Sequence, residues 1–262
     1  MQLAHRVSLG GVQLDEIDPR IIIKGIDGGA GKETTSTVSA GAGDGTRITC
    51  HRRDSMEVAV RFSMMIRRNL IEERGEVLEA IGAWAARGGY LRINYKPNRR
   101  LLVDEIVIPG EGDLWKRFSE YTITFRAHAV PYWEENSAVS AVTGSGTTGS
   151  GSIEIAGSVE TVADAILANV SGATINNVSI TVGGKTMAFT GIGMGAGQSL
   201  TIDHVVRNKK LVMRARVGST SVMAMRSDAS ADDYNVQPGA CSFSFAAQRA
   251  CRLTVSSRGR FV

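Results

Sequence analysis

The sequence predicts a mainly β protein, in which an N-terminal antiparallel β-sheet or barrel with one packed α-helix precedes a C-terminal β-sandwich. In the first half, stretches with apolar residues at every second position surround one stretch with helical spacing. In the second half, short strand-like stretches recur about every ten residues, and no helical period of useful length occurs. The 43% hydrophobic content of the 262 residues is enough for proper cores.

The first half begins its regular pattern at Met56, where the segment MEVAVRFSMMI alternates apolar and polar residues to Ile66 and predicts a half-buried strand. From Ile71 to Arg87 the spacing becomes helical, with Glu72 and Glu73 in the first turn and a Gly-Gly stop after the end. One apolar stripe should pack this helix against the sheet, and its residues are Val77, Leu78, Ile81, Trp84 and Ala85.

Strand patterns resume after the helix. We expect strands over residues 90–95, 101–108 and 121–129, the last with Tyr121, Ile123, Phe125 and Ala127 on one face. The first half is therefore interpreted as a mostly antiparallel sheet with one helix against it.

A change in composition divides the chain. Residues 137–152 are rich in Ser, Gly and Thr, and this density is typical of a flexible connector or hairpin arm. The segment contains a formal G-x-G-x-x-G at Gly144, Gly146 and Gly149, but no helix pattern follows, so dinucleotide binding is not favoured. The predicted domains are residues 1–137, a linker or arm over 138–152, and a sandwich over 153–262.

The second half contains short predicted strands, with Gly183-Gly184 as a two-residue hairpin turn between two of them. These strands occupy residues 179–182, 185–189, 199–202, 211–217, 242–245 and 252–255.

The segment Ile26 to Thr37, IDGGAGKETTST, has the glycine-rich turn and Gly-Lys of a phosphate-binding loop. That loop also needs a Gly five positions before the Gly-Lys glycine and a Ser or Thr after the lysine, but Ile26 and Glu33 stand there. β-branched residues follow where a helix should open. We interpret the segment as a loop between strands, and we expect no cofactor.

No catalytic or metal-binding constellation is predicted. The nucleophile elbow and the H-E-x-x-H pattern are missing from the sequence, and the four histidines lie far apart along it. Glu134-Glu135 could be half of an acid–base pair, but a solvated strand end is the favoured interpretation. Cys50, Cys241 and Cys251 have no C-x-x-C spacing, so buried free thiols are favoured, although Cys241 and Cys251 could face each other across adjacent strands.

Charge and hydropathy limit the class of partner. The net charge is +4, but the basic residues are scattered in pairs without interleaved aromatics, which argues against specific nucleic-acid recognition. No apolar run approaches the roughly 20 residues that cross a bilayer, so membrane insertion is not expected. We expect the chain to fold in a cytoplasm.

Several short motifs together resemble the distal tail proteins of long-tailed (siphovirus-like) bacteriophages, the tail hub family. They are the segment 121–126 leading into VPYWE at 130–134, the strand end at 200–203, VQPGACSFSF at 236–245, and the closing Arg258-Gly259-Arg260-Phe261. These motifs occur in both halves of the chain, although the Ser/Gly-rich arm is longer than the family usually needs.

This resemblance implies a tail-tube-like N-terminal domain that forms a homo-hexameric ring, and a C-terminal galectin-like domain that points outward. It implies a place at the virion tail tip, between the tail tube protein and the tail-tip or tail-associated protein, with receptor-binding or baseplate proteins as further partners. DNA would pass through the lumen without specific binding. On this view residues 28–45 are a loop at a ring surface.

Two alternatives stay open at the level of sequence. The sandwich could be a carbohydrate-binding module, which needs an exposed aromatic platform, whereas Phe243 and Phe245 alternate like core residues. The chain could instead be a cell-wall-acting enzyme component, which needs paired carboxylates or a metal site.

Overall fold

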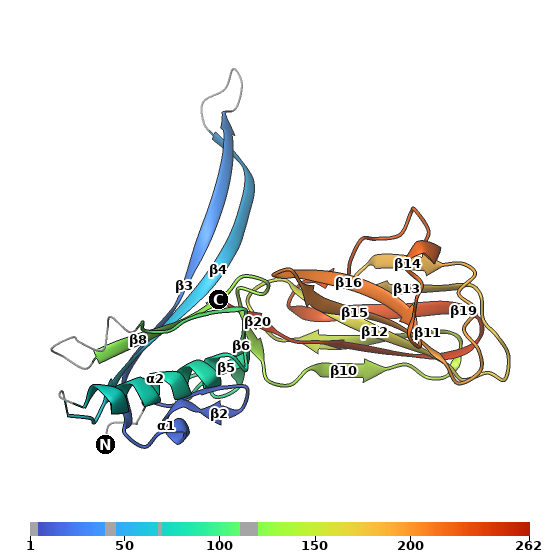
Figure 1. Ribbon diagram of the computed structural model, residues 1–262. Coiled ribbons are helices and arrows are strands. Elements are labelled where there is room, and N and C mark those ends of the chain that lie inside the picture. Colours follow the sequence, from blue (N-terminus) through green and yellow to red (C-terminus); the bar gives the residue numbers. More distant parts are fainter. Residues whose placement is uncertain (1–4, 40–45, 68–69, 111–119) are drawn as a thin grey trace. The chain divides into compact units, whose positions relative to one another are not determined.

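The computed structural model describes residues 5–39, 46–67, 70–110 and 120–262 (Figure 1). The chain divides into two compact units, one that ends at Trp133 and also contains Val262, and one from Glu134 to Phe261. The structure is mainly β, as the sequence predicts, and the strand pairs described below are antiparallel.

The first unit contains two groups of antiparallel strands. One is ordered β2-β1-β5-β6 and the other β3-β4-β8-β7. Alternate residues of both groups are buried, so each group turns one apolar face inward. The strands are β1 (Val7–Leu9), β2 (Val12–Gln13), β3 (Ile21–Ser39), β4 (Thr46–Met64), β5 (Gly89–Ile93), β6 (Arg99–Val103), β7 (Glu105–Val107) and β8 (Glu120–Ala127).

The predicted helix is α2 (Ile71–Ala85), preceded in the chain by a single turn, α1 (Leu14–Ile17). Trp84 of α2 is 2% exposed, its ring meets the edge of Phe125 at a centroid distance of 6.0 Å, and its Nε1 donates to the Val12 carbonyl at 3.0 Å. The helix stops as predicted, because Gly88 and Gly89 have positive φ angles of 60° and 101°. The helix therefore closes the core of this unit.

The expected loop over residues 26–37 is wrong, because β3 continues through it to Ser39. β3 pairs with β4 from Ile21↔Met64 to Ser39↔Thr46, and shifts in register interrupt the ladder at four points. Such irregularities absorb the glycines, and the β-branched residues after Glu33 favour extended backbone. Residues 40–45 of the predicted ring-surface loop lie outside the described residues.

Strands β3 and β4 extend far beyond the rest of their sheet (Figure 1). β8 pairs with β4 only over residues 56–63. From Gly31 to Ser39, and from Thr46 to Ser55, each of the two strands pairs only with the other among the described strands. We call this two-stranded segment, residues 31–39 and 46–55, the ribbon.

The second unit is a β-sandwich organised around one long strand, β19 (Gly239–Ser257). Its first half pairs with β11 and β13, and its second half pairs with β10 and β12. The two strands predicted at 242–245 and 252–255 are thus one continuous strand. Gly183-Gly184 forms the predicted turn between β13 and β14, with φ angles of 57° and 79°. The remaining elements of the chain are β9 (Trp133–Glu135), which begins at the residue where the first unit ends, and then β10 (Val139–Val142), β11 (Gly146–Ile155), β12 (Thr161–Asn169), β13 (Val178–Val182), β14 (Lys185–Phe189), β15 (Ser199–Arg207), β16 (Lys210–Val217), β17 (Thr220–Ser221), a 3-10 turn (Met223–Met225), β18 (Asn235–Val236) and β20 (Arg260–Phe261).

The expected linker over residues 138–152 is instead part of the sandwich. Residues 139–142 and 146–155 are strands β10 and β11, both paired with β19. Gly149 and Gly151 stand opposite Phe245 and Phe243, and a Cβ at either glycine would lie 2.6 Å from the facing ring. The phenylalanine rings leave no room for a side chain at these two positions, so glycine is required there. The Ser/Gly-rich segment, which the sequence suggests is flexible, is therefore a packed strand.

The two cysteines of the second unit lie ten residues apart on the same strand, β19, rather than on adjacent strands. Both thiols are free and buried. Burial raises the pKa of Cys241, and it raises the pKa of Cys251 to about 11, so both are inert at neutral pH.

Candidate functional site

The described residues contain no group of three or more His, Cys, Asp or Glu side chains that could hold a metal ion. Within the same residues, no helix has both the length and the apolar character of a membrane span.

Two histidines each meet an aspartate that lies far away in the sequence. His128 Nδ1 lies 2.6 Å from Asp104 Oδ1, and the backbone N–H groups of His128 and Ala129 donate to Asp104 Oδ2 at 2.9 and 2.8 Å. Burial opposes ionisation of Asp104, but these hydrogen bonds outweigh it and lower its pKa. The pair ties the end of β8 to the segment between β6 and β7.

His204 repeats this arrangement in the second unit. Its Nδ1 and its backbone N–H lie 2.9 and 3.1 Å from Asp164 Oδ1, and its side chain is 5% exposed. The aspartate thus holds the imidazole and the backbone of the same residue, as a structural clamp between β12 and β15. In both pairs the tertiary structure supplies a partner that lies at least 24 residues away in the sequence.

Glu134 is not the solvated strand end that the sequence analysis favoured. It is 8% exposed, and its Oε1 accepts from Arg260 Nε at 3.3 Å in the second unit. A carboxylate that is buried and paired with an arginine holds the chain end of this unit in place. This role differs from that of a general acid or base.

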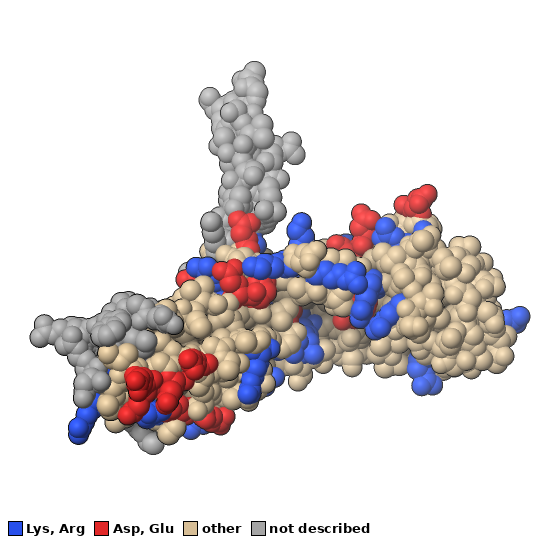
Figure 2. Space-filling view, viewed as in Figure 1, with Lys and Arg blue, Asp and Glu red and all other residues tan. Residues whose placement is uncertain are grey.

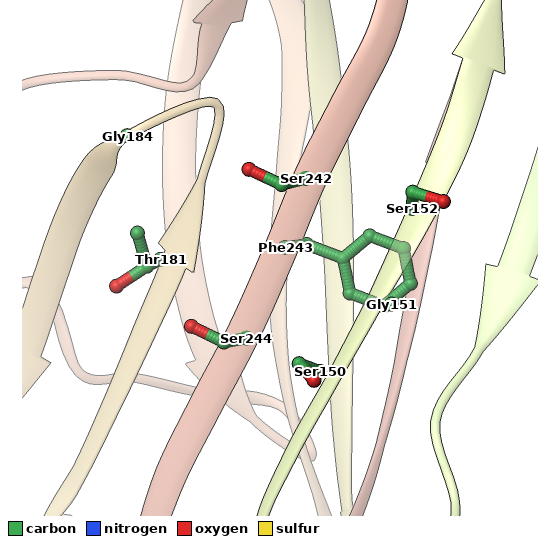
Figure 3. A pocket seen from close by; sticks show the side chains of 8 residues that line it. All are labelled: Ser150, Gly151, Ser152, Thr181, Gly184, Ser242, Phe243 and Ser244. Carbon is green, nitrogen blue, oxygen red and sulfur yellow. The ribbon is translucent and has the colours of Figure 1, made fainter.

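The second unit has a shallow depression of about 530 Å³ on the face of β11, β19 and β13 (Figure 3). Ser150 and Ser152 of β11 and Ser242 and Ser244 of β19 line it. Phe243, the aromatic residue among those that line it, is 2% exposed. A sugar-binding face needs an exposed aromatic ring on which a pyranose can stack, so this depression does not support the carbohydrate-binding alternative.

The first unit has a basic groove of about 290 Å³ beside β1 and β5. Arg6 and Arg92, with Ser8 between them, line it, and both arginines are exposed. Among the described residues neither guanidinium has a carboxylate partner within ion-pair distance. The two arginines are 86 positions apart, so only the pairing of Ser8 with Arg92 reveals the groove.

The same unit carries an acidic face on α2. Glu72, Glu76 and Glu79 are exposed and fall at i, i+4 and i+7, on the side of the helix opposite to its buried stripe. Acidic side chains gather over this part of the surface (Figure 2). Glu73, one residue off the face, is instead paired with Arg20 at 3.0 Å.

The fold of the chain is similar to that of known phage proteins. No protein-family model matches the chain, and no curated protein sequence matches it either. Among solved structures, it is similar to the SPP1 Dit (gp 19.1) protein, described as a paradigm of the hub adsorption apparatus in phages that infect Gram-positive bacteria. The TM-score is 0.65 at 14% identity, and the match covers 98% of this chain and 99% of the other.

A second similar chain belongs to the baseplate of phage p2 in its activated conformation with Sr, with a TM-score of 0.50 and 9% identity over 97% of each chain. Both likenesses extend through the two units. The chain therefore has the fold of the phage Dit hub protein along nearly its whole length.

Proposed function

We propose that this chain is a structural hub of a phage tail tip, assembled as a hexameric ring through its first unit. The ring joins the tail tube to the tail-tip protein, and the second unit carries receptor-binding or baseplate components. The observation that carries the proposal is the fold match with SPP1 Dit, because it includes both units and nearly the full length of both chains. The role is structural rather than enzymatic.

The ribbon supports assembly on physical grounds. A hairpin of two strands is at best marginally stable in water unless it packs against something else. No third strand pairs with the ribbon among the described residues, because β8 ends its pairing with β4 at Met56. A neighbouring copy in a ring would supply the missing contacts, and closed rings arise from such heterologous contacts.

The test is direct imaging of the purified full-length protein. Negative-stain electron microscopy should show six-fold rings with an open centre, and mass photometry should show a species of six chains. If the protein stays monomeric up to near-millimolar concentration, the proposal is wrong.

A further inference from the structure

We propose that the basic groove of one copy, centred on Arg6 and Arg92, binds the acidic face of α2, residues Glu72, Glu76 and Glu79, of the next copy. This inference rests on the proposed ring, and it names the surfaces that meet between neighbours. The occupant is a second copy of this chain, and the argument is charge complementarity between two surfaces of one unit.

The groove is built to receive an anionic group. Its two guanidiniums are exposed and lack an ion-pair partner among the described residues, and Ser8 lies between them on the outer side of β1. Glu16, whose partner Gln13 also lines the groove, is already engaged, because Gln13 donates to it from its backbone and from its side-chain amide at 3.2 and 2.9 Å. An incoming carboxylate would find donors rather than competing acids.

The acidic face carries three carboxylates on one stripe, and none has an ion-pair partner among the described residues. Arg20 lies close enough to Glu76 for an electrostatic attraction, but its ion pairs are with Asp18 at 2.7 Å and with Glu73 at 3.0 Å. Three like charges at this spacing repel one another unless they are neutralised. A cationic surface opposite them removes that repulsion.

The two surfaces cannot meet within one copy. Leu91 and Ile93 of β5 point into the core that α2 covers, so Arg92 between them points away from it. The acidic stripe lies on the outer side of α2, opposite Val77, Ile81 and Trp84. Complementary patches that face away from each other match only between successive copies, which is the head-to-tail contact of a ring.

The test uses two charge-reversed forms of the full chain. The groove variant is Arg6→Glu with Arg92→Glu, and the face variant is Glu72→Lys with Glu76→Lys and Glu79→Lys. Each alone places like charges at every contact, so the concentration for half-assembly should rise at least about tenfold. Mixed in equal amounts, the two variants place opposite charges at every contact, and assembly should return in rings with strictly alternating subunits.

Controls separate this inference from the ring itself. Arg249→Glu with Lys210→Glu, and Glu154→Lys with Asp228→Lys and Asp232→Lys, reverse the same number of charges at exposed sites in the second unit, and these variants should assemble like the wild type. If the groove variant has a lowered melting temperature, the neutral variant Arg6→Gln with Arg92→Gln replaces it. The assembly of this neutral variant should be less sensitive to salt than that of the wild type.

The outcomes are distinct. A wild-type protein without rings overturns the proposed function. Wild-type rings together with reversed variants that also assemble, or a folded mixture that fails to assemble, overturn only this inference. Loss of assembly in each variant and its return in the mixture establish the contact.

Discussion

At the scale of single residues, the structural role of a residue often depends on a contact with a residue that is far away in the sequence. Nothing in the sequence next to Gly151 requires a glycine, but the ring of Phe243 on β19 occupies the space that a Cβ at this position would need. Asp104 gains its hydrogen bonds from residues 24 and 25 positions later. The identity of such residues is explained by the contact rather than by the local sequence.

Replacement of Gly151 by valine should destabilise the second unit. Its Cβ would lie 2.6 Å from Phe243 Cζ, and the buried ring has little room to move. Overpacking of this kind costs about 1 to 3 kcal/mol of unfolding free energy. Urea denaturation of Gly151→Val and of the matched control Ser150→Val, an exposed neighbour, measures it. Equal midpoints for the two variants would show that the ring does not require the glycine.

Replacement of Asp104 by asparagine should remove a pH-dependent part of the stability. The folded-state pKa of Asp104 lies below its ordinary value of 3.8, so its contribution is complete above about pH 4 to 5 and is lost as pH falls through the folded pKa. At neutral pH we expect Asp104→Asn to lose about 1 to 3 kcal/mol, typical of hydrogen bonds to a charged group.

Denaturation midpoints of wild type and Asp104→Asn, measured from pH 7 to pH 3, test this expectation. The two curves should converge as the pH falls. A constant difference would mean that the ionised carboxylate contributes nothing beyond the shape of the side chain.

At the scale of elements, the helix and the ribbon show two ways to stabilise secondary structure. α2 has a full apolar stripe and is covered by its own unit. The ribbon continues beyond β8, so among the described strands it consists of β3 and β4 alone. An element that cannot be stable alone indicates where a neighbour binds.

Trp84→Ala should destabilise the first unit strongly. The indole is 2% exposed, stacks edge-on against Phe125 and donates a hydrogen bond to Val12. Loss of a buried tryptophan costs about 3 to 5 kcal/mol. Thermal denaturation followed by circular dichroism measures it, and Trp84→Phe should lose markedly less. An unchanged melting temperature for Trp84→Ala would contradict the packing role of the helix.

Shortening the ribbon should separate folding from assembly. Replacing residues 32–55 by Asn-Gly joins Gly31 to Met56, which are paired, through a two-residue turn and leaves the β4–β8 ladder intact. The shortened protein should keep a cooperative unfolding transition but should no longer form rings in mass photometry. Rings of normal size from this variant would assign assembly to another surface.

At the scale of the whole molecule, each unit has its own core, and the long strand β19 organises the second one. In the second unit, 26 buried residues form one hydrophobic cluster. This division allows the two units to have separate tasks, with assembly in the first and docking in the second, as the proposed function requires.

A fragment of residues 134–262 should fold and remain monomeric, because the ribbon, the basic groove and the acidic face all belong to the first unit. Light scattering over a range of concentrations, with the full chain as the reference, tests this expectation. Rings formed by the fragment alone would reverse the assignment of roles to the two units.

The sequence by itself determined the fold class, the strand pattern from Met56 to Met64, the helix from Ile71 and its glycine stop, because alternation, helical spacing and turn chemistry are local properties. Tertiary structure alone decided that residues 26–39 are a strand and that residues 146–155 belong to the sandwich. It also brought Arg6 to Arg92, Asp104 to His128 and Glu134 to Arg260. Glycine, serine and charged residues carry little local preference for strand, so only their cross-strand partners settle where they lie.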